Sequence, residues 1–162
     1  MLFISGISFS QDMFTPPGPL DNPFLVSTEG TWISEPYELM GGKWIDEYTF
    51  SWTLNHQFLE MRIKTSSTDG KMTFNSYGIM SADNEGNYKC WTFDDFGYRS
   101  AGIFIGKISG NRLTMAGGTM ISKGEMTIVV DGGKMTEEAI MYMKDAEGKD
   151  QTMKVRIVSN KK

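Results

Sequence analysis

The sequence has very few of the side chains from which most catalytic and metal centres are built. It contains one cysteine, Cys90, and one histidine, His56. A single thiol excludes an intramolecular disulfide and a zinc site made of several cysteines. A single imidazole excludes multi-histidine metal centres and leaves His56 as the only base for a serine triad. We therefore expect no metal site.

Positive charge is also scarce. Lys and Arg number 16 against 20 Asp and Glu, which gives a formal net charge of −4. The only basic doublet is at residues 161–162. Binding to nucleic acid needs a basic surface that neutralises phosphates, so nucleic acid is not expected as a partner.

The sequence lacks a long hydrophobic run as well. No stretch approaches the roughly 20 apolar residues of a membrane-spanning helix, so no transmembrane segment is expected. Residues 1–11 are partly apolar and contain Ser8-Phe9-Ser10, the small-x-small pattern of a signal-peptidase site. They have no charged region before the apolar run. They are either the remnant of a secretory signal, which implies a secreted or periplasmic protein, or an apolar tail of a cytoplasmic one.

A proline-rich segment comes next. Residues 15–23 read TPPGPLDNP, and four prolines within nine residues argue against a helix and against a central strand. We expect an extended arm over residues 12–25 and a single folded domain over residues 26–162. The length of 162 residues suits one domain.

Apolar and polar residues alternate with a period of two through most of this domain. In KWIDEYTFSWTL, at residues 43–54, one face carries Trp44, Asp46, Tyr48, Phe50 and Trp52. Turn sequences such as STDGK and DGGK separate the alternating runs, and no stretch shows a convincing helical period. We predict an all-β fold, a single antiparallel up-and-down β-barrel of about ten strands, because closure of such a sheet removes its exposed edges.

The order of several motifs carries a resemblance to a known family. GTW at residues 30–32 is followed by WTLNHQFL at 52–59, WTFDDFG at 91–97 and LTMAGG at 113–118. This order resembles the domain of unknown function 1579 family over roughly residues 30–158. The resemblance implies a lipocalin-like, calycin-type barrel and implies no particular activity, because the family has no established one.

Haem is considered because haem-binding calycin barrels of the nitrobindin type also begin with Gly-Thr-Trp. The resemblance to them implies an iron-ligating histidine late in the chain, and this sequence has none after His56. His56 lies in LNHQF, where we expect a solvated hairpin turn. No cofactor is therefore expected.

A barrel of this size encloses space for its own side chains and one small ligand. We expect a small, largely apolar molecule in the interior, because the aromatic face and 13 methionines suit the lining of a ligand pocket. Arg62 and Glu60 share one strand face, which we expect to point outward; if it points inward, they would recognise a ligand headgroup. Trp91 or Asp94 is expected at the barrel mouth. The candidate ligand-binding residues are Trp44, Tyr48, Phe50, Trp52, Trp91 and Arg62.

Two other functions remain open. The protein is a small-molecule hydrolase or isomerase if Asp94, Asp95 or Glu60 points into the cavity and acts as acid or base. On one strand, Asp94 and Asp95 would point to opposite faces, so we expect them to be turn residues that accept hydrogen bonds from backbone N–H groups. The third function is that of a structural barrel filled by its own side chains. An enzyme is the less favoured of these possibilities, and the sequence indicates no oligomeric state.

Overall fold

Residues 18–82, 86–145 and 147–162 are described by the computed structural model, and they form one short helix, a 3₁₀ turn and eleven strands. The predicted signal remnant, residues 1–11, and residues 12–17 of the predicted arm lie outside the described residues. The elements in chain order are α1 (Pro23–Thr28), β1 (Gly30–Ser34), β2 (Tyr37–Leu39), β3 (Gly42–Thr53), β4 (Phe58–Ser67), β5 (Thr73–Ala82), β6 (Tyr88–Asp94), η2 (Gly97–Arg99), β7 (Gly102–Ser109), β8 (Arg112–Gly118), β9 (Ser122–Asp131), β10 (Lys134–Lys144) and β11 (Asp150–Lys161).

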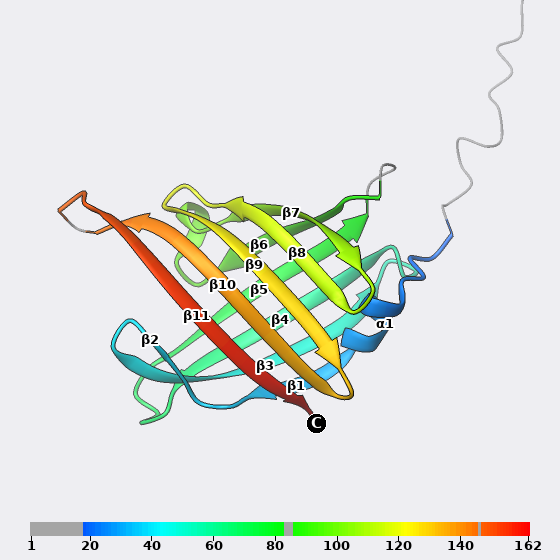
Figure 1. Cartoon of the computed structure of the whole chain (residues 1–162), viewed down its shortest axis with the longest axis horizontal. Coiled ribbons are helices and arrows are strands. Elements are labelled where there is room, and N and C mark those ends of the chain that lie inside the picture. Colours follow the sequence, from blue (N-terminus) through cyan, green and yellow to red (C-terminus); the bar gives the residue numbers. More distant parts are fainter. Residues whose placement is uncertain (1–17, 83–85, 146) are drawn as a thin grey trace, which may run out of the picture.

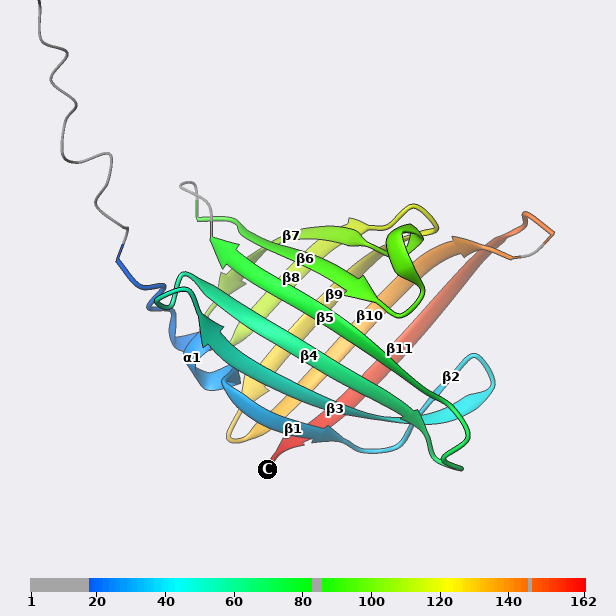
Figure 2. The same cartoon turned by 180° about the vertical axis from the view of Figure 1, so that it is seen from behind.

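The sheet closes on itself, as Figures 1 and 2 show from opposite sides. From β3 to β11, each strand pairs antiparallel with the next one along the chain. β1 then pairs with β11 on one side and with β3 on the other, which closes a ring of ten strands. β2 is a short extra strand beside the start of β3. The prediction of a closed antiparallel up-and-down β-barrel of about ten strands is confirmed.

Turn glycines adopt the backbone conformation that the sequence pattern requires. Gly70 in STDGK has φ of 73°, and Gly132 and Gly133 in DGGK have φ of 55° and 82°. Residues with a side chain rarely adopt these angles, so glycine allows the tight reversals between β4 and β5 and between β9 and β10.

The barrel begins earlier in the chain than Val26, the predicted start. α1 lies at one end of the barrel (Figure 1), and its residues Phe24 and Leu25 are only 3% and 0% exposed. The helix forms despite the nearby prolines because Pro23 occupies its first turn, where no hydrogen bond from its nitrogen is needed. The side chain of Asn22 caps it by accepting a hydrogen bond of 2.9 Å from the backbone N–H of Phe24.

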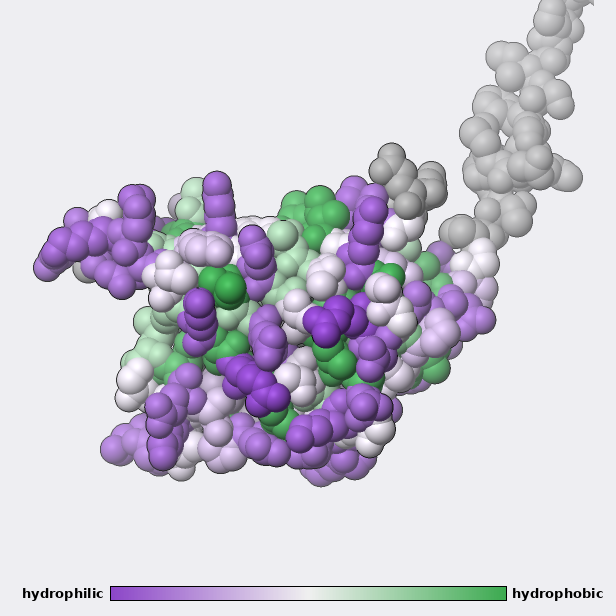
Figure 3. All heavy atoms as spheres, in the orientation of Figure 1, coloured by the Kyte–Doolittle hydropathy of each residue, from purple (hydrophilic) through white to green (hydrophobic). Residues whose placement is uncertain are grey.

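Strand register identifies the inner face of the barrel. Tyr48 and Phe50 of β3 are buried, and they pair with Ile63 and Met61 of β4. Side chains alternate across a strand, so Asp46 also points inward, whereas Glu60 and Arg62 of β4 point outward. Figure 3 shows hydrophilic side chains over much of one outer face, with smaller apolar areas between them.

The interior is packed most tightly at the end that α1 covers. Buried side chains from six strands gather there, namely Phe50, Leu59, Met80, Cys90, Leu113, Met115 and Met135. Toward the opposite end, inward-facing residues such as Ile63, Ser76 and Met141 keep part of their surface exposed. The barrel is therefore sealed at one end and less completely filled toward the other.

Candidate ligand-binding site in the barrel interior

The packed half of the barrel contains a small apolar cavity. Its volume is about 50 Å³, and α1 closes it with Phe24 and Leu25. Five methionines from five strands also line it, namely Met61, Met80, Met115, Met126 and Met135. Pockets for drug-sized ligands have volumes of roughly 300–1,000 Å³, so a ligand of that size would have to displace side chains here. Methionine permits such displacement because its side chain is unbranched and flexible.

Polar groups cluster on the inner wall beside this cavity. The carboxylate of Asp46, only 3% exposed, accepts two hydrogen bonds at Oδ2, from Tyr37 at 3.0 Å and from Tyr48 at 2.9 Å. The side-chain hydroxyl of Ser34 in β1 accepts a hydrogen bond of 2.8 Å from the backbone N–H of Asp46. Oδ1 of Asp46 is buried and has no hydrogen-bond partner among the described residues.

A second carboxylate, Glu137 of β10, faces this cluster. Its burial and the negative charge of Asp46 raise the pKa of Glu137 from an ordinary 4.5 to about 7, and a hydrogen bond from Tyr48 partly offsets the rise. Burial and the two carboxylates also raise the pKa of the Tyr37 and Tyr48 hydroxyls, which keeps both phenols protonated. A phenol has one proton to donate, so Tyr48 cannot satisfy both carboxylates at once.

Residues of the polar cluster are neighbours of cavity-lining residues on the strands. Glu137 is paired across the sheet with Ile128 of β9, and Met135 lies two residues before it on the same face of β10. Both of these neighbours line the cavity. On β3, the ring of Tyr48 stacks on that of Phe50, another lining residue, with a centroid separation of 6.2 Å. The interior therefore joins an apolar compartment to a pair of acidic groups.

Four of the six predicted ligand-binding residues lie on the inner face, but they occupy different levels of the barrel. Phe50 lines the cavity, and Tyr48 belongs to the polar cluster. Trp44 lies toward the opposite end, where its ring meets that of Phe74 edge-on at 5.7 Å. Trp52 stacks on His56 at 5.1 Å beside the β3–β4 turn.

The other two candidates, Trp91 and Arg62, are on the outer face of the barrel and do not line its interior. Trp91 lies between Cys90 and Thr92, which line the cavity, so strand alternation turns it outward. The Arg62 side chain is 66% exposed and pairs with Glu60 at 3.1 Å. The expectation that Glu60 and Arg62 form an outward-facing pair is confirmed.

Asp94 and Asp95 act as turn residues, as expected. Oδ1 of Asp94, the last residue of β6, accepts hydrogen bonds from the backbone N–H of Phe96 at 2.8 Å and from the Ser100 hydroxyl. Oδ2 of Asp95 instead accepts two hydrogen bonds from Asn75, at 2.7 Å and 3.0 Å. The two carboxylates bind different partners and form no catalytic pair with each other. With Arg62 they border an open groove of about 450 Å³ that runs along the outside of the barrel.

His56 lies in a turn, as the sequence suggests, and Cys90 lies in the core. Cys90 is buried, and burial raises the pKa of its thiol to about 11, so the thiol is not activated. His56 is exposed in the turn between β3 and β4. Among the described residues, no group of three or more His, Cys, Asp and Glu side chains has the geometry to hold a metal ion. The same residues contain no helix with the length and apolar character that crossing a membrane requires.

Our sequence reasoning did not single out Tyr37, Asp46 or Glu137 as site residues. One sequence signal points to each of the two carboxylates. Asp46 is the one charged residue on the aromatic face of its strand, and Glu137 has the same strand parity as Ala139 and Met141. A carboxylate on an apolar strand face is costly to bury, which makes it a candidate for function.

Comparisons with known proteins support the fold. No family model matches the sequence, and no curated protein matches it. The structure is similar to the crystal structure of Rv2717c from M. tuberculosis, with a TM-score of 0.68 over 87% of this chain and 98% of that chain. The two sequences are 15% identical, so the similarity is evidence about the fold alone.

Proposed function

We propose that the protein binds a small, largely apolar molecule inside the barrel. The observation that carries this proposal is the apolar cavity of about 50 Å³, whose lining residues Ile128 and Met135 are strand neighbours of the inward-facing Glu137. Apolar walls with a few convergent polar groups are typical of ligand sites. The motif order at residues 30–118 also supports our proposal that the chain is related to the domain of unknown function 1579 family and has a lipocalin-like, calycin-type barrel.

A pair of variants tests the role of the cavity. A methyl group added at Gly78 would lie 2.8 Å from the terminal carbon of Met61, whose flexible end can move into the cavity. Gly78→Ala should therefore fill part of the cavity at little cost in stability. Leu25→Ala should enlarge the cavity, because Leu25 is fully buried in its wall.

The measurement is native mass spectrometry of the gently purified protein, followed by calorimetric titration with small apolar compounds such as benzene and butanol. We expect Gly78→Ala to weaken binding and Leu25→Ala to strengthen it. Ile105→Ala removes a similar apolar side chain from the exposed outer face and serves as the control. If no compound binds wild type or Leu25→Ala, the interior is filled by its own side chains and the protein is a structural barrel.

Acid–base catalysis is the second candidate function, and its candidate residues differ from those expected from the sequence. A pKa of about 7 allows Glu137 to donate or accept a proton at neutral pH, as general acid–base catalysis requires. In this function Asp46 and Glu137 replace Asp94, Asp95 and Glu60 as the acidic pair. Turnover of a bound compound that is lost in Glu137→Gln, with binding retained, would favour this function over simple binding.

A further inference from the structure

We propose that Asp46 and Glu137 together bind the ammonium group of a small amine whose apolar part lies in the methionine-lined cavity. This inference rests on the proposed function, because it assumes that the interior admits a ligand. It adds the chemical class of that ligand, a primary amine, and the residues that distinguish it from a neutral molecule of the same shape.

The Asp46 carboxylate has one unused hydrogen-bond acceptor, Oδ1. Both hydrogen bonds that the structure gives the Asp46 carboxylate are made at Oδ2, by Tyr37 and Tyr48. Oδ1 is buried without a partner among the described residues, and its side chain belongs to the inner face of β3. A buried acceptor that makes no hydrogen bond costs free energy, so this atom favours a ligand that brings a donor.

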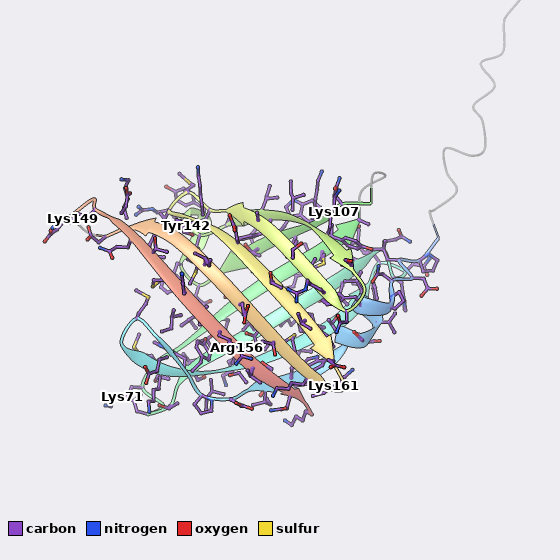
Figure 4. The ribbon with its side chains drawn as sticks, in the orientation of Figure 1. Lys71, Lys107, Tyr142, Lys149, Arg156 and Lys161 are labelled. Carbon is purple, nitrogen blue, oxygen red and sulfur yellow. The ribbon has the colours of Figure 1, made fainter. Side chains whose placement is uncertain are left out.

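The negative charges of Asp46 and Glu137 favour a cationic ligand. Within the described part of the chain, every ion pair joins partly or largely exposed side chains, and neither Asp46 nor Glu137 takes part in one. Figure 4 shows Lys71, Lys107 and Lys149 at the periphery of the molecule, away from the interior. Two neighbouring carboxylates without a cation repel each other when both are ionised, and a bound cation would relieve that repulsion.

The number of hydrogen-bond donors favours an ammonium group over an alcohol. An ammonium group has three N–H donors, enough to reach Oδ1 of Asp46 and the Glu137 carboxylate together. An alcohol has one donor and no charge, so it satisfies one of the two carboxylates at most. A hard metal ion would require more oxygen ligands than this pair supplies.

The position of the carboxylates relative to the cavity favours a ligand with one charged end. Phe50, Ile128 and Met135 line the cavity and are strand neighbours of the polar residues. A ligand that reaches from the carboxylates into the cavity therefore has one charged end and an apolar remainder. Butylamine has this form, and 1-butanol is its neutral counterpart of nearly the same size.

The test is calorimetric titration of the full-length protein with butylamine and with 1-butanol at pH 8, where the amine is protonated. We expect wild type to bind butylamine about tenfold more tightly than 1-butanol, because hydrogen bonds between charged groups are stronger than neutral ones. Glu137→Gln and Asp46→Asn should each remove this preference for the amine and leave 1-butanol binding unchanged. Glu138→Gln is the control, since Glu138 is exposed on the outer face of the same strand and pairs with Arg156 at 3.4 Å.

A pH series adds a second readout. The titratable groups that face Glu137 are Asp46 and Tyr48 of β3 and Tyr37 of β2. Since both tyrosines remain protonated, the affinity for butylamine should rise between pH 6 and pH 8 as Glu137 loses its proton. The rise should be absent in Glu137→Gln.

The outcomes separate this inference from the proposed function. Equal affinity of wild type for butylamine and 1-butanol would overturn the inference and leave the proposed function in place. A preference for the amine that persists in Glu137→Gln would also overturn it, because the charge would then be recognised elsewhere. Absence of binding by either compound would overturn both. If Asp46→Asn does not fold, Glu137→Gln alone decides.

Discussion

The indole nitrogen of Trp32 donates a hydrogen bond of 2.7 Å to the backbone carbonyl of Thr28. This contact joins the last residue of α1 to the first barrel strand, and Trp32 itself is fully buried. The helix that seals the barrel is thereby fixed to the ring of strands by a residue of the GTW motif. The motif thus has a structural role at the sealed end.

Replacing Trp32 should therefore destabilise the barrel. Trp32→Phe removes the hydrogen bond and leaves the Thr28 carbonyl buried without that donor, which should lower the free energy of unfolding by about 1–3 kcal/mol. Urea unfolding followed by circular dichroism measures the change. Trp91→Phe, on the outer face, is the matched control and should cost less. Equal losses in the two variants would show that the bond to α1 contributes little.

Leu25 should be among the most sensitive positions of the core. Its side chain is fully buried against the cavity, so Leu25→Ala should lower stability by about 2–5 kcal/mol and leave a larger void. Thermal unfolding with and without benzene is the measurement, and benzene should restore part of the loss by occupying the void. A Leu25→Ala variant as stable as Ile105→Ala would contradict the position of α1 over the barrel end.

Glu137 should make stability depend on pH. Its pKa is about 7 in the folded protein and near 4.5 when exposed, so the folded state binds more protons between these values. The contribution of Glu137 to the free energy of unfolding should therefore be most favourable below about pH 4.5. It should fall by on the order of 2–3 kcal/mol as the pH rises to 7.

Comparison with Glu137→Gln isolates that contribution. The variant has no titrating group at this position, so its stability relative to wild type should increase from pH 5 to pH 8. Glu138→Gln, one residue away on the outer face, should show no such trend. Urea midpoints at several pH values give the answer, and parallel pH profiles for wild type and Glu137→Gln would refute the assignment.

Cys90 should react slowly while the protein is folded. Its thiol is buried and its pKa is about 11, so little thiolate exists near neutral pH and reagents cannot reach it. Labelling with Ellman's reagent at pH 8 should be slow in buffer and fast in guanidinium. A rapid reaction in the absence of denaturant would show that the interior opens readily.

The fold could be predicted from the sequence because its signals are local. Strict alternation in β3 and glycine-containing turns define antiparallel neighbours without reference to the rest of the chain. α1 could not be anticipated in the same way, because six residues are too few to show a helical period. Its stability comes from Leu25 packing into the barrel end, which is a tertiary contact.

The candidate site was less accessible to sequence reasoning. Alternation shows that Glu60 and Arg62 share one face of β4. It does not show which face of β4 points into the ring, so it cannot assign the pair to the exterior. The polar cluster depends on β3 and β10 facing each other across the barrel. Glu137 and Glu138 are adjacent in sequence, and only the register of β10 against β9 and β11 shows which of them points inward.

The pairing of β1 with β11 has a consequence for folding during synthesis. Trp32 lies opposite Lys161 in this pair, so the ring cannot close until nearly the whole described chain has left the ribosome. Before then, the partial sheet has open edges with unpaired backbone groups, which favour association between chains. Loss of β11 should accordingly yield aggregates instead of a smaller barrel, and chaperones that shield open sheet edges should matter most until β11 has been synthesised.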